Sequence, residues 1–417
     1  MEGTYLMNTV RVGLISMTMA LCAPLAHAQK KLPRWKIDPY TKNEPAAMKK
    51  AGYVSFGPFP FGELGTKIIT SKRIDEHLNY AKIRWVETAH FRIGSTLRAW
   101  PVPTEIEVRR KLRSELERLK KKLGRRVNPK TRVLDPWLRL HLTAQRMEEL
   151  YTEIQELLGV KDSQFPKDSK SKVYGATYMG EGPYMGMNEK FMILVTNKGN
   201  TYFDYLKNFT GRQSKFGQRW HYMKQGSLFY GIGCDMNKGS LKHDTALHCD
   251  LVFNTTINII DGFRHYSYDL PVWIREGLGH YYQRRVNEKW NTFDQDEAAP
   301  FDPPSKWKWK PYVRQLLLGK KWSKFSKVIQ WRHYGDINFY DHVMIWARTD
   351  FLMSLGKEKF KEFMFLIKGR YDYKTGKVPT GSIVGVTRDA MNKVYKLNPL
   401  NFDNKFKEWA IATYPAR

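Results

Sequence analysis

The sequence predicts an α+β fold in which a small β-sheet precedes a predominantly helical C-terminal half. Two strand-like segments, residues 85–93 and 191–195, lie on either side of two long amphipathic helical segments, residues 104–124 and 135–159. From Asp336 onward, the apolar residues recur mainly at helical spacing. A sheet with one apolar face and helices with apolar stripes bury those surfaces against each other, so we expect a sheet covered by helices.

The N-terminus has the features of a secretory signal peptide. Arg11 precedes an apolar run, Val12–Leu25, and Ala26-His27-Ala28 forms an A-x-A cleavage site. The run is too short for a good membrane span, and no later stretch approaches the length of a transmembrane helix. We therefore expect residues 1–28 to be removed after Ala28, and the mature protein to be exported to the periplasm or the extracellular space.

The composition is strongly basic and poor in cysteine. Lys and Arg number 70 against 41 Asp and Glu, which gives a net charge of +29 in 417 residues. Such an excess attracts polyanions. For an exported protein we expect an envelope polyanion or an anionic membrane surface, not a specific nucleic acid. Cys234 and Cys249 are too few for a disulfide-built scaffold, and they either pair or remain as two buried thiols.

The chain divides into an N-terminal arm and one main domain. Residues 29–80 are basic, rich in Pro and Gly and weakly periodic, which is typical of an extended arm over the main body. Residues 81–417 are expected to form the domain. Its strand and helix part covers residues 81–240, and its helical part, which would carry the site, covers residues 241–417.

Three segments read as strands. Residues 85–93 alternate well enough for one strand, residues 191–195 form a short apolar run, and residues 226–234 carry alternating large side chains. His90 lies in the first of these segments, where a structural role explains a histidine better than a catalytic one.

The first long helix is expected to begin at Thr104, with Glu107 completing a capping box, and to end at Gly124. Its buried stripe consists of Val108, Leu112, Leu116, Leu119 and Leu123. Its other faces and the following loop carry Arg109, Arg110, Lys111, Arg113, Arg118, Lys120, Lys121, Lys122, Arg125, Arg126, Lys130 and Arg132. A run of this kind usually marks a solvated face.

The second long helix is expected to start at Asp135, with Pro136 behind it, and to end at Gly159. Its core side is marked by Trp137, Leu140, Ala144, Met147, Leu150, Ile154 and Leu157. The C-terminal helices are expected at residues 340–355, 357–367, 387–397 and 401–414.

The segment Pro271–Tyr282 is the most informative part of the chain. Its proline suits the first turn of a helix, where a missing N–H costs nothing. Trp273, Leu278 and Tyr281 can share the packed side, and Glu276 is carried among them. Because burying a bare charge is costly, this carboxylate needs a partner, and a salt bridge to an arginine is the simplest explanation.

The pattern Trp-x-x-Glu-Gly-Leu-(small)-x-Tyr at residues 273–281 resembles the third-ligand helix of gluzincin metallopeptidases, in particular the peptidase-MA-like families. Thr88-x-His90-Phe91 is similar to the opening strand of those chains. The resemblance extends over roughly residues 81–417 and implies a zincin-like fold. In that family the glutamate, here Glu276, binds zinc together with two histidines of an upstream H-E-x-x-H helix.

The upstream motif is degenerate in this chain. His248 aligns with the first zinc ligand, Cys249 then occupies the position of the general base, and Val252 occupies that of the second histidine. The glutamate after the first histidine activates the zinc-bound water, so its loss removes the proton shuttle. The resemblance therefore predicts a pseudo-peptidase without a cofactor, which serves a binding or scaffolding role in the cell envelope.

An active enzyme is the alternative hypothesis. Starting the motif at His243 does not restore it, because Leu247 then stands where the second histidine should be. His280, however, lies one helical turn beyond Glu276, and with His248 it could complete a non-standard zinc site. The second hypothesis is accordingly a zinc-dependent peptidase or other hydrolase that uses His248, Glu276 and His280.

A third hypothesis treats the protein as a basic surface binder. Lysines and tryptophans alternate in Lys306, Trp307, Lys308, Trp309 and Lys310. Aromatic rings between lysines can stack on bases or sugars while the charges meet anions, so this segment is a candidate polyanion- or glycan-binding site. The alternative is a loop and helix edge with buried tryptophans. The sequence does not indicate an oligomeric state.

Overall fold

The computed structural model describes residues 32–168, 170, 177–267, 270–293, 308–370 and 382–416. The predicted signal peptide lies outside these residues. Asp38–Arg417 form one compact unit, and the short 3-10 helix Arg34–Lys36 belongs to a separate one. No helix within the described ranges is long and apolar enough to cross a membrane.

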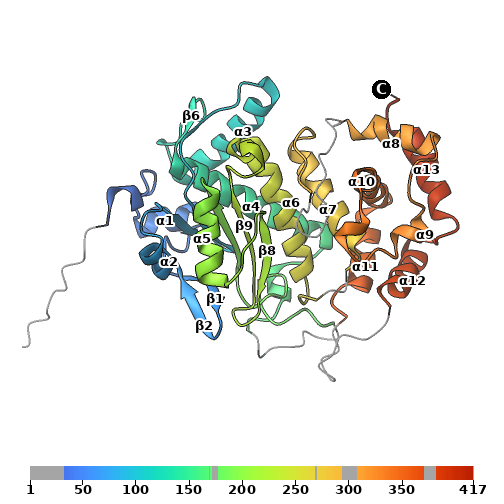
Figure 1. Ribbon diagram of the computed structural model, residues 1–417, viewed down its shortest axis with the longest axis horizontal. Helices are drawn as coiled ribbons and strands as arrows, with labels where there is room; N and C mark the ends of the chain where they lie inside the picture. Colours follow the sequence, from blue (N-terminus) through green and yellow to red (C-terminus); the bar gives the residue numbers. More distant parts are fainter. Residues whose placement is uncertain are drawn as a thin grey trace, which may run out of the picture. The chain divides into compact units, whose positions relative to one another are not determined.

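A five-stranded mixed sheet forms the centre of the larger unit, with the strand order β3-β4-β7-β9-β8 (Figure 1). Its strands are β3 (Arg84–Glu87), β4 (Phe91–Ser95), β7 (Phe191–Thr196), β8 (Gln218–Tyr222) and β9 (Ser227–Gly233). The inner strands β4, β7 and β9 run parallel, and β3 and β8 pair antiparallel at the two edges. The small sheet expected before the helical half is therefore present.

The single strand expected over residues 85–93 is wrong, because this segment makes a tight turn between β3 and β4. Thr88 N donates to the Phe91 carbonyl at 2.8 Å, and Phe91 N donates to Thr88 Oγ1 at 3.1 Å. The apolar alternation continues through the turn, so it gives no sign of the break. His90 lies in this turn, and its ring contacts Glu148 at 2.6 Å and Asp162 at 3.1 Å. Burial opposes its charge, but the two carboxylates raise the pKa of His90 to about 9, which suits a structural tie.

Residues 38–80, which the sequence predicts as part of an extended arm, instead carry regular elements of the compact unit. These are α1 (Pro45–Ala51), β1 (Pro60–Leu64), β2 (Lys67–Thr70) and α2 (Ser71–His77). Phe59, Phe61 and Ile74 are buried in a core cluster with Trp85. Each element is too short to show a periodic pattern, which explains why the segment reads as irregular.

The two faces of the sheet bury different clusters because side chains alternate along each strand. Ile93, Ile193 and Tyr230 point into the large core cluster, where they meet the long helices. Met192 and Phe229 point the opposite way, toward α5 (Gly199–Thr210) and the β1–β2 hairpin. Both faces are covered, so the sheet lies in the interior.

The helix α4 (Pro136–Leu158) confirms the predicted bounds. Asp135 Oδ1 accepts from Trp137 N at 2.9 Å and from Leu138 N at 3.1 Å, and Gly159 ends the helix with φ 59°. The capping box expected at Thr104 is wrong: α3 (Ile106–Leu123) has Glu105 at its N-cap and no side-chain cap. A short ladder of β5 (Trp100–Pro101) and β6 (Val133–Leu134) connects the chain on either side of α3.

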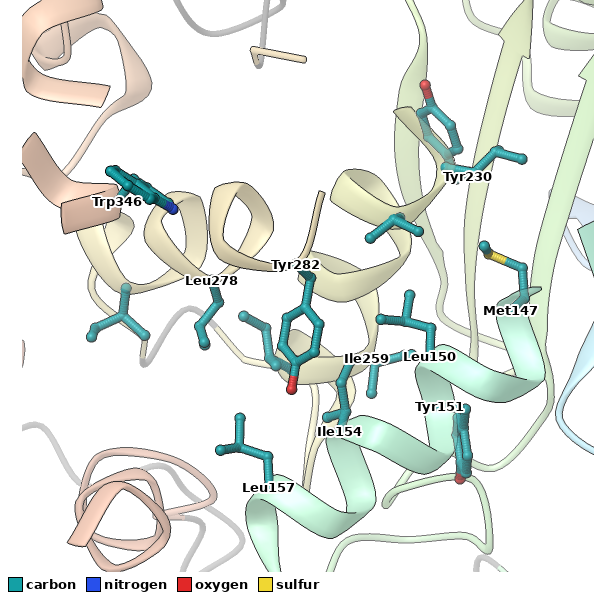
Figure 2. Close-up of a cluster of buried hydrophobic side chains, with 14 of the residues drawn as sticks. Met147, Leu150, Tyr151, Ile154, Leu157, Tyr230, Ile259, Leu278, Tyr282 and Trp346 are labelled. Carbon is teal, nitrogen blue, oxygen red and sulfur yellow. The ribbon is translucent and has the colours of Figure 1, made fainter. Parts of the chain in front are cut away.

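The C-terminal half is helical, as expected. It contains α6 (Asp244–Gly262), α7 (Val272–Val286), α8 (Trp309–Leu318), α9 (Phe325–Val328), α10 (Phe339–Ser354), α11 (Lys357–Ile367), α12 (Ile383–Tyr395) and α13 (Phe402–Thr413). The helix α7 packs against α6 on one side and α10 on the other. Figure 2 shows Leu150, Ile154 and Leu157 of α4 gathered with Ile259 of α6 and Tyr282 of α7. The segment Pro271–Tyr282 therefore lies in the middle of the helical core.

Candidate functional site

A buried group of three ionisable side chains joins α7 to α10. Glu276 and His280 lie one turn apart on α7, and His342 comes from the first turns of α10. Glu276 Oε2 lies 3.9 Å from His280 Nε2 and 3.5 Å from His342 Nδ1, and the two imidazole nitrogens lie 2.9 Å apart. Exposure is 0% for Glu276 and His280 and 1% for His342. These atoms are close enough to hold a metal ion.

Two glycines place α7 close enough to its neighbours for this group to form. A Cβ at Gly277 would lie 2.2 Å from Thr349 Oγ1 on α10, and a Cβ at Gly279 would lie 2.8 Å from the ring of Phe253 on α6. Real Cβ atoms do not approach that closely, so both helix contacts depend on glycine. The Gly-Leu-Gly part of the motif thus has a packing role.

The imidazole of His280 has a defined hydrogen-bonding state. Gln283 Oε1 accepts from Thr292 N at 2.9 Å, which orients the amide so that Gln283 Nε2 donates to His280 Nδ1 at 2.7 Å. His280 therefore carries its proton on Nε2 and donates it to His342 Nδ1. Burial, followed by the proximity of His342 and Arg284, lowers the pKa of His280 well below its usual value. The ring is neutral at physiological pH.

His248 does not belong to this buried group and instead lines a cleft. Its Nδ1 is 3.8 Å from Glu115 Oε1 of α3, and the residue lines a cleft of about 340 Å³ together with Val252 one turn along. Burial and the nearby Arg146 charge lower the pKa of His248 well below its usual value. Of the three ligands in the alternative hypothesis, the structure brings Glu276 and His280 together; the third member of the metal-capable group is His342, not His248.

The cleft around His248 is formed by residues of α3, α4, α6 and α7. At its base, Arg146 contacts Glu115 at 2.7 Å and Asp244 at 2.8 Å. Burial alone would raise the pKa of Asp244, but the Arg146 guanidinium outweighs it and lowers the pKa to about 2. Asp244 is thus held as a carboxylate by this arginine, which also pairs with Glu115. Two further ion pairs, Arg118–Glu149 and Arg285–Glu153, line the cleft and are more exposed than those of Arg146.

Both cysteines of the described chain are free and buried. Cys249 turns toward α7, where its Sγ lies 3.7 Å from the Gln283 carbonyl oxygen and 3.8 Å from that of Asn287. Burial raises the pKa of the Cys249 and Cys234 thiols to about 12. At neutral pH neither is a thiolate, so Cys249 offers neither a general base nor a ready metal ligand.

The candidate polyanion site of residues 306–310 is described only from Lys308 onward. Lys308 and Lys310 are exposed. Trp309 is 1% exposed, and its ring lies 5.2 Å from that of His280 and 4.0 Å from the Arg284 guanidinium. A ring in this position cannot stack on a sugar or base, so the stacking role expected for Trp309 is wrong. The tryptophan instead covers the buried group, because α8 begins at this residue and packs its first turn on α7 and α10.

Reasoning from the sequence missed His342 as a member of the group. The signal available was modest: a histidine within the apolar stretch 340–346, at a position facing the inside of a helix. Glu276 and His280 are found by local spacing, whereas His342 depends on which helix packs against α7. No family model matches the chain, and comparisons with curated proteins and with solved structures give no significant match.

Proposed function

We propose that the protein is an exported binding or scaffolding protein of the cell envelope, built on a gluzincin-like fold that no longer hydrolyses peptides. The observation that carries this proposal is the separation of the expected zinc ligands. His248 lines the cleft, whereas Glu276 is fully buried with His280 and His342.

Metal-dependent peptide hydrolysis needs an ion with an open coordination position and a general base beside it. Among the described residues that line the cleft, His248 is the one imidazole. The nearby carboxylates of Glu115 and Asp244 are held by Arg146, and a carboxylate whose pKa is lowered to about 2 is a poor base. The buried group, in turn, has no surface that a peptide could reach. The active-hydrolase alternative therefore has less support than loss of activity.

We expect no peptide cleavage by the purified protein. The measurement is mass spectrometry of a peptide library incubated with the protein, with added zinc and with chelator. The result that would overturn the proposal is cleavage that chelator stops and that His248→Ala abolishes. His77→Ala, at a distant histidine on α2, serves as the matched control and should leave any such activity unchanged.

A second observation favours an anionic polymer as the ligand. Every lysine and arginine predicted for the basic face of α3 and the following loop is exposed. Arg110 pairs with Glu107 and Arg118 with Glu149, while Lys120, Lys121 and Lys122 extend from the last turn of the helix. Consecutive cations on one exposed surface attract a polyanion by charge alone, which requires no stacking ring.

We expect binding to polyanionic polymers such as teichoic-acid-like phosphodiesters, with an affinity that falls steeply as salt rises. Replacing Lys120, Lys121 and Lys122 with Gln should weaken binding about tenfold and reduce its salt dependence. The charge-matched control replaces Lys357, Lys359 and Lys405, which are exposed on other helices. Equal losses in the two variants would show that net charge alone acts, and no loss in either would reject α3 as the binding face.

A further inference from the structure

We propose that Glu276, His280 and His342 form a structural site for a divalent metal ion of the zinc type, which fastens α7 to α10 inside the core. The inference does not rest on the proposed function, because a sealed ion stabilises a fold whether or not the protein hydrolyses anything. It also differs from the site expected from the sequence, since it replaces His248 with a residue of the C-terminal helices.

The spacing of the three donor atoms fits one small ion. A tetrahedral zinc ion bound at about 2.0–2.1 Å sets its ligand atoms about 3.4 Å apart. The three distances between the donor atoms of Glu276, His280 and His342 are 2.9, 3.5 and 3.9 Å, which lie on both sides of that tetrahedral spacing. Glu276 carries two oxygens, so three side chains can supply four donor atoms.

The type of donor and the surroundings favour zinc over a harder ion. Two imidazoles and one carboxylate suit zinc and its transition-metal neighbours, whereas magnesium and calcium prefer oxygen alone. The rings of Phe253 and Trp309 lie 5.0 and 5.2 Å from that of His280, and Phe293 lies 5.0 Å from His342. An apolar shell of this kind excludes water from a site. An ion enclosed there has a structural role, because substrate cannot reach it.

Metal binding at His280 Nε2 requires the proton on that nitrogen to move to Nδ1. Its Nε2–H donates to His342 Nδ1, and an ion bound by both nitrogens requires Nε2 to give up that hydrogen. Because the two nitrogens lie only 2.9 Å apart, such an ion would sit beside the line that joins them, on the side of Glu276. His280 then carries its proton on Nδ1, and a half-turn of the Gln283 amide presents the oxygen to it. Metal-bound histidines usually donate their second N–H to such an acceptor. The half-turn breaks both hydrogen bonds between Gln283 and Thr292, because Nε2 would then face the Thr292 N–H and Oε1 its carbonyl oxygen, so metal binding must also shift the loop after α7.

The test is the metal content of the full-length mature protein, measured by elemental mass spectrometry after expression in zinc-supplemented medium and dialysis against EDTA. We expect about one ion per chain, which is released only when guanidinium unfolds the protein. His342→Gln should lose the ion while retaining the helical circular dichroism. The matched control is His248→Gln, which changes the cleft histidine and should keep the ion.

A gain-of-signal variant keeps the test decisive if His342→Gln does not fold. In His342→Cys, a thiolate replaces the imidazole, and refolding with Co²⁺ should give a thiolate-to-metal charge-transfer band that the parent protein lacks. The inference is overturned if the parent holds less than a tenth of an ion per chain both after expression and after refolding with Zn²⁺. It is also overturned if His248→Gln loses the ion and His342→Gln keeps it.

Discussion

Replacing Arg146 with Leu is expected to lower the free energy of unfolding by about 3–5 kcal/mol. The guanidinium is 7% exposed and bridges Glu115 and Asp244 at the base of the cleft. Without it, Asp244 must either stay charged without its main partner or take up a proton against burial next to a second acid, and either state destabilises the fold. Denaturant unfolding monitored by circular dichroism at pH 7 measures the change.

The matched control is Arg118→Leu, which removes the exposed pair with Glu149 at 45% and 39% side-chain exposure. We expect this change to cost less than about 1 kcal/mol. The double variant Arg146→Leu, Asp244→Leu should regain part of the lost stability, because it also removes the buried acid that has lost its arginine partner. Equal effects of Arg146→Leu and Arg118→Leu would contradict the assignment of Arg146 as the central cation of the cleft.

Gly277→Ala is expected to destabilise the protein by about 2 kcal/mol, although alanine is the better helix former. Its Cβ would lie 2.2 Å from Thr349 Oγ1 and 3.1 Å from the Ile345 carbonyl oxygen, so α7 and α10 must move apart. Thermal and denaturant unfolding measure the loss of stability. The same variant should reduce the bound metal, because Glu276 and His342 lie on the two separated helices.

Two further variants test whether the clash of the new Cβ with α10 causes the loss of stability in Gly277→Ala. Gly385 lies in α12, and an added Cβ there meets nothing closer than 3.8 Å, so Gly385→Ala should stabilise the protein by about 0.5–1 kcal/mol. Thr349→Ala removes the hydroxyl that the new Cβ strikes, and combined with Gly277→Ala it should recover much of the loss. If Gly277→Ala were neutral and the double variant no more stable, the close helix contact would not hold in solution.

The sequence reveals those features that are encoded locally. The α4 boundaries follow from Asp135, Pro136 and Gly159, because a cap and a terminator act within a single turn. The pairing of Glu276 with His280 follows from the 3.6-residue period. By contrast, the turn between β3 and β4 is hidden because the alternation runs through it, and the short β8 carries no apolar pattern of its own.

The rest of the candidate site depends on packing between segments distant in sequence. His342 meets Glu276 because α10 packs on α7, and no local pattern specifies that partner. The side toward which His248 points is set by how α6 rotates between α4 and α7. Trp309 looks like a surface aromatic among lysines, yet the position of α8 buries its ring. Features that depend on local spacing can therefore be predicted from the sequence, whereas contacts between distant helices cannot.

The parallel strands at the centre of the sheet have a consequence for how the chain folds. Phe91 of β4 pairs with Phe191 of β7, and the two are separated by both long helices. Closing such a distant pair costs chain entropy before any contact repays it, and folding rates fall as the mean sequence separation of contacts rises. The helices α3 and α4 can form early from local contacts, but the sheet cannot close until β7 has docked. We therefore expect the joining of β4 to β7 to be the slow step of folding, because α4 packs on β4 and β3, which are near it in sequence, whereas β7 is brought in from beyond both helices.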